Sequence, residues 1–357
     1  MKESAMNPFK PDFREAARRW EAFLAGDIID RPLLCARLPK ADRPPVHDMN
    51  YHEKFLATPE AIVERSFEVL DATHFLGEAI PTFSLSFGCD ELAVFCGGPD
   101  MTVHPDSGDT CWMEPFVTDW ERSLPIVFRD DHPLWRKTLA CWRLARERNG
   151  GRAAMGMLDP HSNLGLLAAM RGAQNLCMDC ADRPELIDRA MESARRVFPH
   201  VWNAIREAGG HDEAGYSYGV YSPRGACMLE CDFSCMISPA MFRRWVVPAL
   251  EEEAAWVRNV CYHWDGVGAL VHADDIVRLK GIYTLSFLPG AGNGRFIEFN
   301  HVHEKCQAAG KAVHVAGTVE ECKAMHRRLK PNLTIYYPQV DSVGEFHTIE
   351  KWFRENT

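Results

Sequence analysis

The sequence alternates between strand-like runs and helical patterns along most of its length. Runs rich in β-branched and aromatic residues predict eight strands, at 32–38, 75–83, 153–158, 214–221, 260–263, 282–288, 312–315 and 333–337. Helical periodicity fills the intervals, most clearly at 164–170, 184–208, 238–260 and 319–329. This alternation predicts a parallel sheet, and eight such units favour its closure into an α/β TIM (β/α)8 barrel.

The length of 357 residues fits a single barrel domain that spans the whole chain, residues 1–357. We interpret residues 1–30 as an N-terminal helical extension, because Phe13, Trp20 and Phe23 recur at helical spacing. Residues 88–148 form an insertion to which the sequence pattern assigns no structure.

Charge and cysteine content exclude several classes of protein. The chain has 40 Lys and Arg against 50 Asp and Glu, a net charge of -10, so we expect no binding to nucleic acid. No stretch approaches the ~20 apolar residues that a membrane helix needs, so we expect no membrane insertion. The 13 cysteines are odd in number and scattered, which favours a reducing, cytoplasmic compartment.

The predicted barrel selects candidate site residues, because catalytic groups in such folds project from the carboxyl ends of the strands. These positions bring together acids, imidazoles and other polar side chains that come from distant parts of the chain. The candidates are Asp159, His161, Asn163, Tyr221, Asp232, His263, Asp265, His314 and Tyr337.

His263 and Asp265 form the sharpest local pattern. Alternate residues of a strand point to the same side, so this pair could ligate one metal ion or share a proton. The alternative is a buried histidine bonded to backbone, with Asp265 capping the next turn. Asp159 and His161 have the same spacing and the same alternative of local turn chemistry.

The segment 227–237 combines cysteines with an acid. Cys227, Cys231 and Cys235 recur every four residues, but free cysteine is ordinarily a small buried apolar residue. Asp232 lies in an apolar run, so it is bonded to backbone or directed at a ligand. The G-x-S-x-G pattern at 215–219 lies in a continuing strand, which disfavours a serine hydrolase.

Several motifs resemble those of the uroporphyrinogen decarboxylase superfamily. They are Asp159-Pro160-His161, Asp182-Arg183-Pro184-Glu185, Ile237-Ser238-Pro239 and His263-Trp264-Asp265-Gly266. The segments Asp30-Arg31-Pro32, Cys231-Asp232-Phe233-Ser234 and Pro289-Gly290-Ala291-Gly292-Asn293 resemble a bacterial branch described as corrinoid-linked methyltransferases. The resemblance covers nearly the whole chain and implies a (β/α) barrel.

The resemblance implies two activities. The decarboxylases hold a tetrapyrrole with an Arg-Gln-Ala-Gly-Arg segment, for which this chain has no counterpart. The methyltransferases hold zinc with a His-x-Cys pair and a distant Cys, and use it to activate a thiol. Here His263 matches, whereas Asp265 replaces the first cysteine and Tyr337 lies near the second, so the implied zinc ligands are His263 and Asp265. The resemblance implies that cobalamin arrives on a partner protein.

We therefore expect a methyltransferase that moves a methyl group between a small methylated substrate and a corrinoid protein or a thiol. His263, Asp265 and Asp232 are the expected catalytic residues. The expected substrate-binding residues are Asp159, His161, Asn163, Trp112, Tyr221, Tyr337 and His314. The alternatives are a cofactor-free decarboxylase acting on a small acid or a tetrapyrrole, and a ligand-binding barrel without catalysis. The sequence leaves the oligomeric state open, a homo-oligomer included.

Overall fold

The computed structural model describes residues 7–99, 102–103, 111–211, 215–217 and 219–357. The strands are β1 (Leu33–Pro39), β2 (Thr73–Gly77), β3 (Thr82–Phe83), β4 (Thr102–Val103), β5 (Cys111–Trp112), β6 (Ala154–Met155), β7 (Gly215–Ser217), β8 (Val220–Ser222), β9 (Cys227–Glu230), β10 (Val260–Asp265), β11 (Ile282–Leu288), β12 (Ala312–Thr318) and β13 (Thr334–Gln339).

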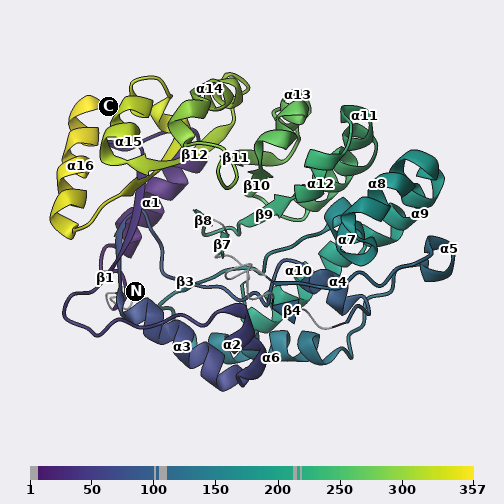
Figure 1. The fold of residues 1–357 in the computed structure, drawn as a ribbon. Coiled ribbons are helices and arrows are strands. Elements are labelled where there is room, and N and C mark those ends of the chain that lie inside the picture. The colour runs from purple at the N-terminus through teal and green to yellow at the C-terminus, as the bar shows by residue number, and fades with distance from the viewer. Residues whose placement is uncertain (1–6, 100–101, 104–110, 212–214, 218) are drawn as a thin grey trace.

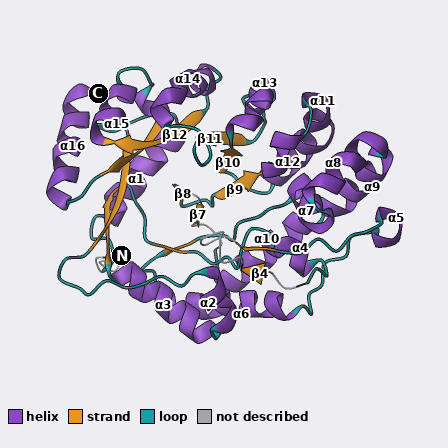
Figure 2. Ribbon diagram, viewed as in Figure 1, coloured by secondary structure: helices purple, strands orange, loops and turns teal. Residues whose placement is uncertain are grey.

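Helices surround the strands on the outside of the molecule (Figures 1 and 2). The α-helices are α1 (Phe13–Leu24), α2 (Tyr51–Leu56), α3 (Pro59–Asp71), α4 (Glu91–Phe95), α5 (Trp120–Ser123), α6 (Pro133–Asn149), α7 (Asn163–Arg171), α8 (Ala173–Asp182), α9 (Pro184–Ala194), α10 (Val197–Gly209), α11 (Pro239–Met241), α12 (Val247–Ala255), α13 (Ala273–Ile276), α14 (Asn300–Ala308), α15 (Val319–His326) and α16 (Val343–Asn356). None of the helices in the described ranges has the length and apolar character to cross a bilayer.

The main sheet has seven strands in the order β2-β1-β13-β12-β11-β10-β9. All neighbours pair in parallel except β1 and β2, which are antiparallel. Its central strands are almost wholly buried, as expected for parallel strands that helices cover: Ile282 and four consecutive residues, 284–287, are buried in β11. The fold is therefore a mixed α/β structure with a mostly parallel sheet, as the alternation of patterns predicts.

The predicted ring of eight continuous strands differs from the structure in three places. The predicted strand 75–83 is two strands in different sheets, because Gly77 has a φ of +57° and ends β2. Within 214–221, β7 and β8 form an antiparallel pair, and residues 214 and 218 lie outside the described residues. Strand β9 was not predicted, because its four-residue cysteine spacing obscures the strand pattern. Strands β3 and β6 form a separate parallel pair.

Two regions that the sequence pattern separates from the barrel contain regular structure. Helix α1 occupies much of the predicted N-terminal extension, and its Trp20 and Phe23 are buried against the core. The predicted insertion at 88–148 contains α4, β4, β5, α5 and the 17-residue helix α6. The apolar face of α6 includes Trp135 and Trp142, both buried, so this region is part of the core rather than an appendage.

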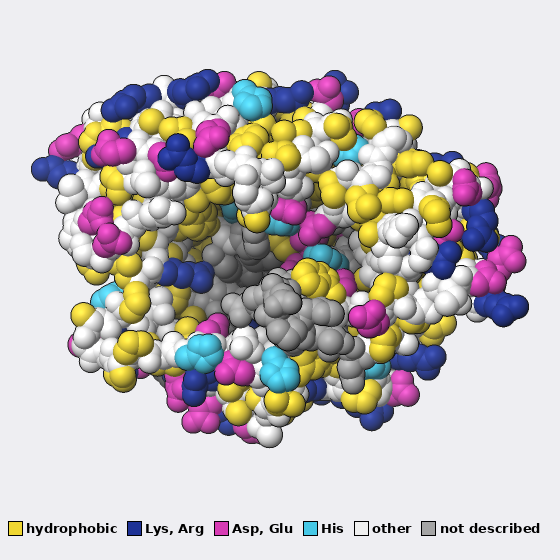
Figure 3. Space-filling view, in the orientation of Figure 1, with side chains coloured by type: hydrophobic (Ala, Val, Ile, Leu, Met, Phe, Trp, Pro, Cys, Tyr) yellow, Lys and Arg dark blue, Asp and Glu magenta, His cyan; other side chains and the backbone are white. Residues whose placement is uncertain are grey.

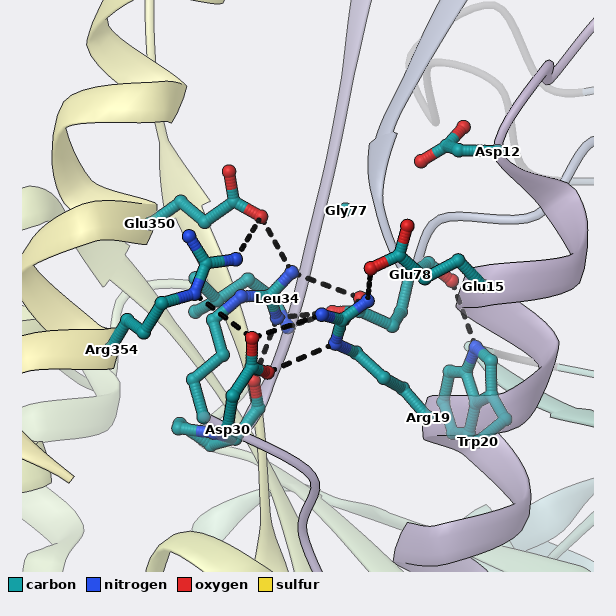
Figure 4. Close-up of polar contacts among 12 residues, drawn as sticks. Asp12, Glu15, Arg19, Trp20, Asp30, Leu34, Gly77, Glu78, Glu350 and Arg354 are labelled. Carbon is teal, nitrogen blue, oxygen red and sulfur yellow. Dashed lines mark hydrogen bonds and ion pairs between the residues drawn. The ribbon is translucent and has the colours of Figure 1, made fainter.

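A buried ion-pair network joins the two ends of the described chain. Arg31 donates to both carboxylate oxygens of Glu78 over 2.6 and 3.0 Å, and both side chains are 1% exposed. The same guanidinium donates to Glu350 of α16 over 2.7 Å. Figure 4 shows Arg19 and Arg354 extending the network through Asp30. This network fixes β1 and β2 against the C-terminal helix.

Candidate active site

The centre of the candidate site lies at the carboxyl ends of β9 and β10. Glu230 is the last residue of β9, and it is in register with His263 on the neighbouring parallel strand β10. Residues in register on adjacent strands project to the same side of a sheet. Asp232 follows at the start of a 3-10 helix (Asp232–Met236). Glu230, Asp232 and His263 each offer a donor atom within 4.8 Å of the others'.

Two further sets of donor atoms adjoin the first. Asp159, His161 and Glu230 form one, and Cys89, Asp90 and His161 form the other, each within the same 4.8 Å limit. Glu230 links the first set to the second and His161 links the second to the third, so they make one continuous row of nitrogen, oxygen and sulfur donors. Metal ions of the zinc type bind these groups.

His161 connects the carboxylates of this row. Its Nε2 lies 3.0 Å from Oε1 of Glu230 and 3.7 Å from Oδ2 of Asp232, and its Nδ1 lies 4.0 Å from Oδ1 of Asp90. Burial opposes protonation of the ring, but the adjacent carboxylates, Glu230 above all, outweigh this effect and raise the pKa of His161 to about 10. The imidazole is therefore a cation at neutral pH.

Asp159 is the second perturbed group of the row. Burial, together with the negative charge of Glu230, raises the pKa of Asp159 to about 8. Asp159 is therefore protonated at neutral pH and hydrogen-bonded to Glu230. Burial also raises the pKa of Asp232 and of Asp90. Clusters of perturbed acids of this kind are typical of catalytic and ligand-binding sites.

A cavity of about 1280 Å³ opens beside the row of donors. Asp159 lines its wall together with the cations Arg37 and Lys54, so the wall carries both an acid and positive charge. Strand ends from β1, β11, β12 and β13 contribute to the lining. Figure 3 shows the hollow in this face of the molecule, with histidine and acidic side chains along one side. The volume exceeds that of most small-molecule pockets.

His314 and Tyr337 line the cavity at the ends of β12 and β13. The hydroxyl of Tyr337 donates to the carbonyl oxygen of Gly219 over 2.9 Å. Burial lowers the pKa of His314 to about 3, so its ring is neutral. Nε2 of His314 has no hydrogen-bond partner among the described residues, which leaves it available to a ligand in the cavity.

The other predicted site residues have different surroundings. Asn163 is buried at the start of α7, where its amide donates to the carbonyl oxygen of Glu230 over 2.9 Å, so it positions the end of β9. Tyr221 is buried edge-on against Phe13 of α1, with 5.7 Å between the ring centroids. Neither these two nor Trp112, which is 44% exposed in β5, is among the described residues that line the cavity.

The structure places only one of the two predicted metal ligands, His263 and Asp265, in a set of donor atoms. His263 belongs to the set of three donors with Glu230 and Asp232, whereas Asp265 belongs to none of the sets among the described residues. The negative charge of Asp265 contributes to the raised pKa of Asp232, after burial and the opposing effects of the two histidines. Asp265 therefore acts on the site electrostatically.

Sequence reasoning missed Glu230, Asp90, Arg37 and Lys54 as site residues. Glu230 had the same signal as Asp232, a carboxylate in an apolar run, but the missed strand hid its position at a strand end. Asp90, whose carboxylate accepts from the backbone N–H of Met113 over 3.0 Å, lies in the region to which the sequence pattern assigns no structure. Arg37 and Lys54 lie outside the motifs, and the fold brings them to the cavity.

Comparison with known proteins gives one informative result. No protein-family model and no curated protein matches the sequence. Among solved structures, a methyltransferase from Methanosarcina mazei is similar, with a TM-score of 0.62 over 96% of this chain and 98% of that one. The two chains share this fold. Their sequence identity of 14% extends the likeness no further than the fold.

Proposed function

We propose that this chain is a methyltransferase that moves a methyl group between a small methylated substrate and a corrinoid protein or a thiol. The observation that carries the proposal is the donor set of Glu230, Asp232 and His263 beside a large cavity, at the carboxyl end of a mostly parallel sheet. The fold shared with a methyltransferase supports it. We also interpret the fold as a distorted (β/α)8 barrel, in which β7 lies against both β6 and β9.

The donor set suits zinc. Catalytic zinc sites have three protein ligands from His, Asp, Glu or Cys and an open fourth position, and one imidazole with two carboxylates meets this requirement. We assign Glu230, Asp232 and His263 to the ion. In the pairing that the sequence predicts, Asp265 would take the place of one of the two other carboxylates, so that the fourth position stays open. A bound zinc ion supplies Lewis acidity, which lowers the pKa of a coordinated thiol.

The remaining residues of the site bind and orient. His161 holds Glu230 through the 3.0 Å contact, and Asn163 fixes the same residue through its backbone. Asp159 and the neutral imidazole of His314 both line the cavity, where they can contact a substrate. Cobalamin, which this proposal places on a corrinoid partner, would meet the chain at the open mouth of the cavity. The cytoplasmic location stays a prediction from cysteine content.

Metal analysis and cobalamin spectroscopy test the proposal together. The purified chain is expected to hold one zinc ion, which Glu230→Gln and His263→Ala remove, while His301→Ala on the exposed surface of α14 retains it. With a corrinoid protein and candidate methyl donors, the wild-type chain should change the absorbance of cobalamin to that of the methyl-cobalt form. With a thiol and methylated corrinoid protein, the reverse change is expected, because the methyl group leaves cobalt for sulfur. If the zinc-loaded chain gives neither change with any donor or thiol, methyl transfer is wrong.

A second function is favoured by one feature of the cavity. Arg37 and Lys54 line it together with Asp159, which retains its proton at neutral pH. A cofactor-free decarboxylase needs this combination: cations that hold the substrate carboxylate, and an acid that protonates the carbanion after CO₂ leaves. Release of CO₂ by the metal-free chain, abolished in Asp159→Asn and Lys54→Gln, would favour this function. If the cavity binds a ligand but the chain catalyses neither reaction, the third alternative, a ligand-binding barrel without catalysis, would hold.

A further inference from the structure

A second cavity, of about 520 Å³, lies at the opposite end of the sheet. Its wall includes Ala226, directly before β9, and Val257, shortly before β10. The first cavity is lined by residues at the carboxyl ends of other parallel strands of the same sheet, such as Leu288, the last residue of β11, and Gln339, the last residue of β13. The two cavities therefore lie at opposite ends of the strands, and the proposed function makes no use of the second.

Three arginines line the second cavity: Arg206, Arg224 and Arg258. None of the three lies within 4.0 Å of a carboxylate among residues that the structure describes, in contrast to arginines such as Arg31 and Arg171. Glu21 is the single acid that the described part of the chain contributes to the wall. Three guanidinium groups around one cavity, with so little compensating charge, attract an anion.

Two tryptophans give the cavity an aromatic character as well. Trp256 is 52% exposed and Trp202 is buried, and both line the wall. The guanidinium carbon of Arg206 lies 5.9 Å from the centre of the Trp202 ring. The indole N–H of Trp202 has no hydrogen-bond acceptor among the described residues, so a buried donor remains for a ligand to satisfy. An exposed indole face offers a surface on which a planar ring can stack.

We propose that this cavity binds a phosphate ester that carries a planar ring, of the size of a nucleotide. Guanidinium groups match phosphate oxygens in two-point contacts, which explains arginine rather than lysine at all three cationic positions. Trp256 stacks on the planar ring, and the volume falls within the range of small-molecule sites. The site is independent of methyl transfer, because it shares none of its lining residues with the first cavity.

Isothermal titration of the full-length chain with ADP tests the proposal. ADP is expected to bind saturably and more weakly at high salt, with adenosine binding far less tightly because it lacks the phosphates. Arg206→Gln and Arg258→Gln should each weaken ADP binding roughly tenfold or more. Trp256→Phe should retain binding, whereas Trp256→Ala should weaken it. Inorganic pyrophosphate is expected to bind through the same arginines with lower affinity.

Two control variants distinguish binding in this cavity from binding elsewhere on the protein. Arg136→Gln changes an exposed arginine of α6 that lines neither cavity, and Lys54→Gln changes a cation of the first cavity. Both should bind ADP as the wild-type chain does. The proposal is overturned if neither ADP nor pyrophosphate binds saturably, if adenosine binds as tightly as ADP, or if Lys54→Gln loses binding while the arginine variants retain it.

Discussion

At the scale of single residues, the site depends on carboxyl groups whose surroundings oppose their ionisation. Asp159, Glu91 and Glu253 each have a pKa raised to about 8, with burial as the first cause. Each is a stability cost near neutral pH that an apolar residue would avoid. Asp159 raises the pKa of Glu91, and Glu253 and the carbonyl oxygen of Glu230 both accept from Asn163, so these acids adjoin the candidate site.

Glu253 makes the stability of the fold depend on pH. Its carboxyl group ionises near 4.5 when unfolded but holds its proton to about 8 when folded. Its contribution to stability is therefore complete below pH 4.5 and is lost as the pH rises to about 8. Glu253→Gln, which stays neutral, should gain roughly 2–4 kcal/mol relative to wild type between pH 5 and pH 8.

Urea denaturation at the two pH values measures this gain. Glu207→Gln, which changes an exposed glutamate near the end of α10 and keeps Glu253, serves as the control and should show the same stability as wild type at both pH values. A stability difference between Glu253→Gln and wild type that stays constant from pH 5 to pH 8 would contradict the raised pKa.

Gly219 lies in close contact with two residues that line the first cavity, so a larger residue at this position should be destabilising. A Cβ atom at this position would lie 2.2 Å from the hydroxyl oxygen of Tyr337 and 3.2 Å from Cε1 of His314. Gly310 has a similar positive φ, +76° against +83°, but a Cβ there meets nothing within 4 Å. Both alanine variants carry the backbone strain, so Gly219→Ala should lose about 1–3 kcal/mol more in thermal or urea unfolding. Equal losses of stability in Gly219→Ala and Gly310→Ala would show that Tyr337 and His314 move aside at no cost.

At the scale of elements, the described chain is held together by contacts between distant helices and strands. Arg31 precedes β1, Glu78 follows β2 and Glu350 lies on α16, and these three side chains form the centre of the network in Figure 4. A buried pair of this kind adds little net stability against an apolar pair, but the loss of one partner leaves an uncompensated charge. Its main effect here is to fix the positions of β1, β2 and α16 relative to one another.

Single and double substitutions separate these effects. Arg31→Met and Glu78→Gln should each cost about 3–5 kcal/mol in urea unfolding, because each leaves a buried charge or carboxyl partner unsatisfied. Arg354→Gln, which removes a 46% exposed partner of Asp30, should cost less than about 1 kcal/mol. The Arg31→Met, Glu78→Gln double variant should be more stable than the sum of the single losses implies. Additive losses would mean that the pair is not coupled.

At the scale of the whole molecule, the last helix closes the fold. Phe346, Ile349 and Phe353 of α16 are each at most 1% exposed, and Glu350 of the same helix completes the network around Arg31. The loss of two buried phenylalanines and one isoleucine costs about 8–15 kcal/mol when the costs of the three single losses are added. This sum is comparable to the total stability of a domain.

Truncation before Val343 is therefore expected to prevent folding of the entire chain, not only of its C-terminal part. Circular dichroism and the loss of a cooperative thermal transition measure this outcome. A Lys351→Gln variant, which changes only the exposed side of α16, should fold normally. A truncated chain that keeps a cooperative transition would show that the sheet is stable without α16.

The amino-acid pattern was sufficient to predict the fold class and several of the strand ends that carry the site. Binary patterns predicted β1, β10, β11, β12 and β13, because buried parallel strands appear as local apolar runs. The same logic placed Asp159, His161 and His263 after strands, and the structure brings them together; it placed Asp232 after the predicted strand 214–221, whereas Asp232 follows the unpredicted strand β9.

The composition of the site, in contrast, required the folded molecule. Glu230 becomes a partner of His263 because β9 pairs with β10, and Arg37 and Lys54 reach the cavity because β1 and α2 border it. Strand pairing and cavity lining depend on contacts between residues far apart in the chain, which no local pattern encodes. The pKa values of the acids follow from the same contacts, because burial and neighbouring charge arise only on folding.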